Sequence, residues 1–149
     1  MADPEQQCMT VRSVMTANPV CVDPETPLRQ AVNLLRDHKI RHLAVTSPPG
    51  RVRGLVSNRD MLVAHMQVSH GGLRIERRVG EIMTREVDSI TPDACAYAAA
   101  RYMYGQKRGC LLVIEQGTLV GILTEADFMR AFAKASGCRC KAAVEQKSG

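Results

Sequence analysis

The sequence is duplicated, and this internal repeat limits what the chain can fold into more than any other feature. A spacing of 68 residues, shortened to 67 by a one-residue gap, superimposes the two halves. Apolar residues, glycines and acidic residues recur in the same order: Val11 and Val79, Met15 and Met83, Leu43 and Leu111, Gly54 and Gly121, Asp60 and Asp127. Such a repeat predicts one supersecondary unit built twice. We therefore expect an N-terminal tail, two copies joined by a linker and a flexible C-terminal tail: 1–10, 11–66, 67–78, 79–134 and 135–149.

Each copy shows the same succession of local patterns. In the first copy an extended segment, 19–22, leads to Thr26, which we expect to cap a helix that has Pro27 at its first position. Apolar residues then recur at helical spacing in both copies: Leu28, Ala31, Val32 and Leu35, then Ala96, Ala99, Ala100 and Met103. Two short apolar runs around a turn predict a β-hairpin, and a second helix follows it at 60–66 and at 127–134.

These patterns predict an α+β protein made of two β-α-β-β-α motifs. A unit of this length, with one thin sheet and two short helices, has too small a core to stand alone. We therefore expect the two motifs to be related by a pseudo-twofold axis and packed sheet to sheet. Such a packing would create two equivalent clefts between the copies.

The junction between hairpin and second helix is the same in both copies: glycine, two apolar residues, Ser or Thr, two variable residues and Asp, at 54–60 and 121–127. One interpretation is structural, because Ser57 and Thr124 would cap the helix while the Asp reaches back to the cap. On that interpretation the chain is a ligand-free dimerisation scaffold. The other interpretation is a nucleotide site. A helix N-terminus favours phosphate, a carboxylate can accept bonds from a ribose diol, and glycine lets a flat base approach.

Composition narrows the classes of partner. The net charge of +5 favours anions without indicating nucleic acid, and aromatic residues, which a base-stacking surface needs, are only 3% of the chain. No apolar run approaches the length of a membrane helix, and residues 1–10 lack the apolar segment of a secretory signal. We expect a soluble cytoplasmic protein with neither a membrane nor a nucleic acid as its partner.

The six cysteines are interpreted as reduced thiols, because no secretory signal accompanies them. Cys21, Cys95 and Cys110 lie in apolar stretches, where we expect small core residues. Cys138 and Cys140 stand among cations, so a thiol or metal sensor is a second alternative function, although their spacing is not that of a zinc site. No constellation of catalytic residues is present, and we expect neither an enzyme, a metal nor a required cofactor.

The repeated segments resemble a tandem pair of cystathionine-β-synthase (CBS) domains, also called a Bateman module. The resemblance covers 11–134 and rests on segments 14–16, 82–84 and 40–43, and above all on the two Gly-x-x-Ser/Thr-x-x-Asp junctions. It implies a stand-alone regulatory module that binds AMP, ADP or ATP, with S-adenosylmethionine as another ligand of the family, and that signals by a change of shape or association. It further implies a disc-like homodimer and a separate enzyme or transporter chain as the regulated partner.

The resemblance also implies roles for residues. The two Asp residues would hold ribose diols, the Ser or Thr would meet phosphate, and the opening segment of one copy would face the junction of the other. The first cleft lies at the second junction, and the residues implied for it are Asp127, Thr124, Ile122, Thr16, Val20, Ile40 and Arg41. The second cleft lies at the first junction, and the residues implied for it are Asp60, Ser57, Arg59, Leu55, Thr84 and Arg108.

Charge makes the two clefts unequal. Arg59 in the first junction corresponds to Ala126 in the second, which therefore lacks a nearby cation by this alignment. The wall that opposes the first junction carries Glu86 and Asp88, which disfavour a polyphosphate. We favour the cleft at the second junction because its opposing wall, 15–20, is uncharged.

Overall fold

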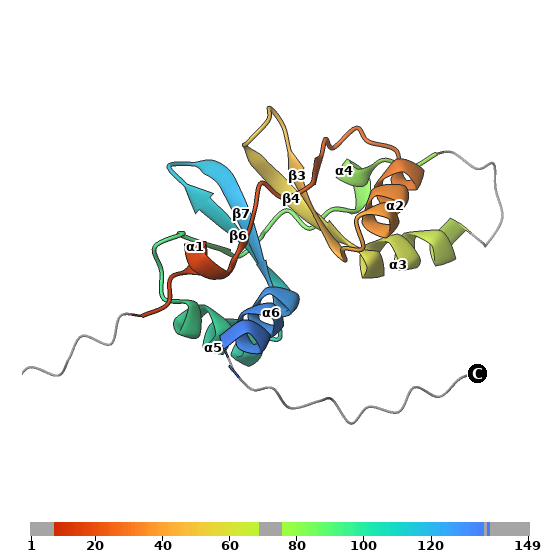
Figure 1. Cartoon of the computed structure of the whole chain (residues 1–149). Coiled ribbons are helices and arrows are strands. Elements are labelled where there is room, and N and C mark those ends of the chain that lie inside the picture. Colours follow the sequence, from red (N-terminus) through yellow and green to blue (C-terminus); the bar gives the residue numbers. More distant parts are fainter. Residues whose placement is uncertain (1–7, 69–75, 136, 138–149) are drawn as a thin grey trace, which may run out of the picture.

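The computed structural model describes residues 8–68, 76–135 and 137, and it contains the predicted motif twice (Figure 1). The first copy consists of β2 (Cys21–Val22), α2 (Leu28–Asp37), β3 (His42–Thr46), β4 (Val52–Ser57) and α3 (Asn58–Val68). The second consists of β5 (Ser89–Ile90), α5 (Ala96–Gln106), β6 (Cys110–Glu115), β7 (Thr118–Thr124) and α6 (Glu125–Ala135). A single-turn helix precedes the β-α-β-β-α motif within each copy: α1 (Val11–Val14) and α4 (Val79–Ile82). The short strand β1 (Thr16–Ala17) follows α1.

The strands form two sheets of matching design. In one, β2 pairs parallel with β3, and β3 pairs antiparallel with β4. In the other, β5 pairs parallel with β6, β6 antiparallel with β7, and β1 adds an antiparallel edge to β7. Both hairpins shift register at the corresponding place, between Val45 and Thr46 and between Val113 and Ile114. The duplication therefore extends to the irregularities of the backbone.

Three groups of buried side chains hold the molecule together. A central group joins the inner faces of the two sheets through Ala44, Cys110, Leu112 and Ile122. The other two groups lie on the outer faces, one beneath α2, α3 and α4 and the other beneath α1, α5 and α6, as the arrangement in Figure 1 shows. The predicted sheet-to-sheet packing is thus confirmed. The apolar surface buried in these three groups of side chains stabilises it.

The opening helices are exchanged between the copies. Helix α1 is the first element of the first copy, yet its Val11 and Val14 lie in the core of the second. Helix α4 is the first element of the second copy, and its Val79 lies in the core of the first. Each motif therefore needs the other for a complete core.

Gly54 and Gly121 allow this exchange. A Cβ at Gly54 would lie 2.6 Å from the backbone oxygen of Thr84, and one at Gly121 would collide with Met15 and lie 3.1 Å from the backbone oxygen of Thr16. On that side of each glycine the opening segment of the other copy fills the space. A flat base, expected there from the sequence, has no room on that side, and the glycines serve chain packing.

The start of α2 differs from the expectation. Pro27 takes the N-cap position with extended backbone, and Thr26 is not the cap. The Thr26 hydroxyl instead accepts the backbone N–H of Asp23 at 3.2 Å and closes the preceding turn. A threonine hydroxyl can cap a helix or close a turn, and that of Thr26 closes the turn that begins at Asp23.

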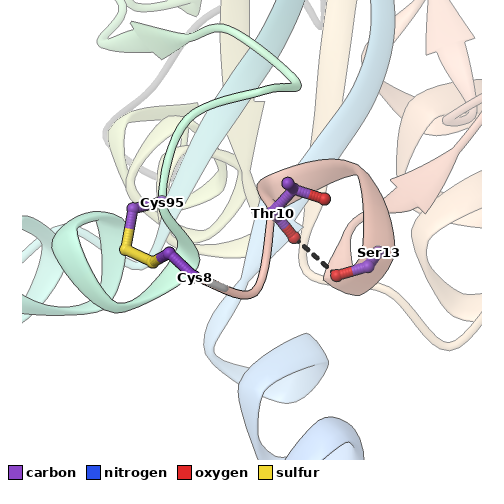
Figure 2. Close-up of a disulfide and its surroundings, with 4 residues drawn as sticks. All are labelled: Cys8, Thr10, Ser13 and Cys95. Atoms are coloured by element: carbon purple, nitrogen blue, oxygen red, sulfur yellow. Dashed lines mark hydrogen bonds between the residues drawn. A yellow bond between two sulfur atoms is a disulfide. The ribbon is translucent and has the colours of Figure 1, made fainter. Parts of the chain in front are cut away.

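The cysteines also differ. Cys95 forms a disulfide with Cys8, with 5.7 Å between the Cα atoms, so these two residues are not reduced thiols (Figure 2). Cys21 is exposed and is no core residue, whereas Cys110 is buried as expected. Burial, followed by the charge of Asp88, raises the pKa of Cys110 to about 12. Cys138 and Cys140 lie outside the described residues, as do the ends of both expected tails.

The longest of the described helices run for 11 residues, and none of them combines the length and apolar character that crossing a bilayer requires.

Candidate functional site

Both strand–helix junctions form the predicted capping arrangement. At the first, the backbone N–H and the hydroxyl of Ser57 each donate to Asp60 Oδ2 at 2.7 Å. At the second, the backbone N–H of Thr124 donates to Asp127 Oδ2 at 2.7 Å and its hydroxyl does so at 2.8 Å. In both copies the Asp therefore reaches back to the residue at the helix start, as the structural interpretation predicted for this contact. The contact leaves the other oxygen of each carboxylate for further partners.

Asp127 is the more unusual of the two carboxylates, because only 2% of its surface is exposed. Its Oδ1 accepts the hydroxyl of Thr16 at 2.7 Å and a bond from Arg130 Nη2. Pairing of β1 with β7 sets Thr16 opposite Ile122 and so brings the threonine to this carboxylate. Its four hydrogen bonds, one of them charge-assisted, hold this buried carboxylate in a fixed position.

A cavity of about 380 Å³ opens beside Asp127. It brings together all seven residues expected for the first cleft: Thr16, Val20, Ile40, Arg41, Ile122, Thr124 and Asp127. Seven further lining residues were not among the site residues expected from the sequence: Asn18, Pro19, His38, Lys39, His42, Ala126 and Arg130. The walls come from both copies, since residues 38–42 belong to the first and residues 122–130 to the second.

The cavity is lined by cations, contrary to the expectation that the second junction lacks one. Arg130 follows Asp127 by one helical turn, a spacing that places both side chains on one face. Lys39 and Arg41 lie on the opposite wall, and Arg41 Nη2 is 3.6 Å from a carboxylate oxygen of the exposed Glu125. Burial, and then the charge of Arg41, lowers the pKa of His42.

The residues expected for the other cleft are placed differently. Leu55 and Thr84 exchange backbone hydrogen bonds of 2.9 Å in each direction, which joins the two copies there. Arg108 Nε lies 2.8 Å from Asp88 Oδ2, so its charge is already balanced by a carboxylate. Arg59 is exposed. Ser57 and Asp60 contact each other as described above.

A metal site is a separate question for a chain with several His and Cys. Within 8–68, 76–135 and 137, no three His, Cys, Asp or Glu side chains come close enough to hold a metal ion. The cysteines at 138 and 140, on which the metal or thiol alternative depends, are outside this part of the chain.

Comparison with known proteins gives one family. The family model of the CBS domain matches the chain twice, over residues 11–66 and 79–134. The fold is similar to AcuB of Vibrio cholerae, a protein assigned to acetoin utilization, with 32% identity and a TM-score of 0.78 over 85% of this chain and 92% of that one. It is also similar to CBSX2, solved in complex with AMP, with 28% identity and a TM-score of 0.72 over 84% and 96% of the two chains. The homoserine O-acetyltransferase of Methanocorpusculum labreanum is 29% identical over 117 residues, and the chain spans 23% of that enzyme.

Proposed function

Because the chain belongs to the CBS domain family, as a pair of these domains, we propose that it is a regulatory module that binds an adenosine nucleotide. The proposed site is the cavity beside Asp127. The observation that carries the proposal is a buried carboxylate and several cations around one cavity shared by both copies. The AMP complex of the similar protein CBSX2 supports the same class of ligand.

Each part of a nucleotide has a complementary wall in the cavity. Asp127 and Thr16 offer hydrogen-bonding groups for the ribose hydroxyls. Val20, Ile40 and Ile122 offer apolar surface for the base. Cations line the rest of the cavity and suit phosphate: Lys39, Arg41 and Arg130.

We propose that the ligand acts by joining the two copies. Residues 38–42 lie on one wall and the first turn of α6 on the other, so a bound nucleotide favours the arrangement in which both walls contact it. A separate enzyme or transporter chain would then respond to that arrangement. We assign the chain itself no catalytic role.

We expect ligand binding to appear first as thermal stabilisation. Unfolding is measured with AMP, ADP, ATP and S-adenosylmethionine, with and without magnesium, and with GTP as the control for the base. A ligand at a hundredfold its dissociation constant adds about 2.7 kcal/mol to the free energy of unfolding. In a domain of this size that raises Tm by about 5–10 °C. If none of these compounds shifts Tm at millimolar concentration, the nucleotide proposal fails and the ligand-free dimerisation scaffold replaces it.

We also propose that two copies of the chain associate through α3 and α6. These helices expose large apolar side chains, with exposed fractions of 60% for Leu62, 61% for Met66, 73% for Met129 and 79% for Phe132. Such side chains are typical of an interface core.

The test of the dimer is a double substitution, Leu62→Asp with Phe132→Asp. We expect it to weaken dimerisation at least a hundredfold, because two charges per chain would have to be buried in the interface. Sedimentation velocity measures the oligomeric state. Val32→Asp, at an exposed apolar position on α2, is the matched control that should remain dimeric. A wild-type protein that sediments as a monomer would contradict the proposal.

A further inference from the structure

Asp127 has no hydrogen-bonding capacity left in this structure. A carboxylate has about four lone-pair positions, two on each oxygen. Oδ2 accepts the N–H and the hydroxyl of Thr124, while Oδ1 accepts Thr16 and Arg130. A ribose diol can therefore bond to this carboxylate only if one of the present donors leaves.

Arg130 is the donor best able to leave. The two Thr124 bonds belong to the cap of α6 and lie within one helical turn. Thr16 is held in place by the pairing of β1 with β7. Arg130 has a long, flexible side chain that is 48% exposed, so water or an anion can solvate its guanidinium elsewhere.

We propose that Arg130 is a movable cation that neutralises Asp127 when no ligand is bound and transfers to a phosphate of the ligand when a ribose takes its place. This inference rests on the proposed nucleotide site. The buried carboxylate of Asp127 and the phosphate of a nucleotide would repel each other. The guanidinium of Arg130, placed between them, reduces this repulsion and explains how one cavity can accept an anionic ligand. The exchange identifies the ligand class as a ribonucleotide with at least one phosphate, not a neutral nucleoside.

The transfer has a structural consequence. The same Arg130 Nη2 that contacts Asp127 also donates to the backbone oxygen of Val14 at 3.2 Å, at the end of α1. When Arg130 turns to the phosphate, α1 loses this bond to α6. The ligand-bound protein then differs from the ligand-free protein in how firmly α1 is held, which gives a partner chain a feature to recognise.

The first junction has no equivalent device. The position that corresponds to Arg130 in the repeat is Val63, an exposed apolar residue. Of the two junctions, only the one that contains Asp127 can therefore make the proposed exchange.

The test compares a nucleotide with its nucleoside. Binding of AMP and of adenosine to the wild type and to Arg130→Met is measured by titration calorimetry. We expect the variant to bind AMP at least tenfold more weakly, because the phosphate loses its cation. We expect it to bind adenosine as tightly as the wild type or more tightly, because the competitor for Asp127 is gone. Arg130→Lys, which keeps the charge, should recover part of the affinity for AMP.

The control is Arg29→Met, which removes an exposed arginine on α2 outside the cavity lining and should change neither affinity. If Arg130→Met weakens AMP and adenosine equally, Arg130 only supports the structure and the proposal is wrong. If it changes neither affinity, the proposal is also wrong, while the nucleotide site stands. A wild-type protein that binds neither compound overturns the site and the exchange together.

Discussion

Asp127→Asn is expected to weaken nucleotide binding by about ten- to a hundredfold and to lower Tm by about 5–10 °C. Asparagine has almost the same volume, but its amide nitrogen cannot accept a hydrogen bond. The four donors that now surround the carboxylate would meet a single oxygen, and Arg130 would lose its counter-charge. Loss of the charged acceptor for the ribose hydroxyl that takes the place of Arg130 removes about 1.5–3 kcal/mol of binding. A similar loss of capping and ion pairing destabilises the fold by about 2–3 kcal/mol.

The matched variant is Asp60→Asn at the other junction. Asp60 is half-buried and its bonds in the structure come from Ser57, so we expect a smaller loss of Tm. Calorimetry with AMP and thermal unfolding of both variants separate the two roles of the pattern. Binding of AMP by Asp127→Asn at wild-type affinity would show that the cavity beside Asp127 is not the ligand site, even if Tm falls.

The order of elements could be predicted from the sequence because it depends on short-range signals that occur twice. Helical spacing, the turns of the hairpins and the Ser/Thr-x-x-Asp caps are each contained within a few residues. The capping bonds at Ser57 and Thr124 appear as expected. The cross-copy contacts at Asp127 came from the resemblance to CBS pairs, and the seven residues it implied for that cleft do line one cavity.

The charge of the cavity could not be predicted by aligning the copies. That alignment compared Arg59 with Ala126 and concluded that the second junction has no cation. Arg130 lies three residues after Asp127, and helical spacing alone was enough to place the two together. Lys39 was missed for another reason: it follows α2 with positive φ, and the direction of such a residue depends on the turn.

The disulfide between Cys8 and Cys95 could not be predicted either. The two residues are 87 positions apart, and nothing local indicates that they meet. They meet because α1 packs on the second copy, where Val11 N–H bonds to the backbone oxygen of Ala94 at 2.8 Å. Reduced thiols were inferred from the absence of a secretory signal. The cellular compartment is weaker evidence about a disulfide than the position of the two cysteines in the fold.

Reduction of this disulfide is expected to lower Tm by about 5–10 °C. A cross-link across 87 residues of sequence restricts the unfolded chain strongly, and such bonds typically add about 2–4 kcal/mol to the free energy of unfolding. Thermal unfolding with and without a thiol reductant measures the effect. A non-reduced digest analysed by mass spectrometry should contain the peptide pair that joins Cys8 to Cys95.

Two serine substitutions make the test specific. Cys8→Ser should lower Tm without reductant and should remove the response to it, because no bond to Cys95 remains to be broken. Cys21→Ser, at an exposed free cysteine, should leave the full response in place. An unchanged Tm of the wild type in reductant would mean that the backbone contacts of residues 9–12 hold α1 without the cross-link. In that case the bond from Ala96 N–H to the backbone oxygen of Met9, at 2.7 Å, and its neighbours carry the attachment. If Tm falls as expected, the cross-link adds to these backbone bonds and to the burial of Val11 and Val14 in holding α1 on the second copy.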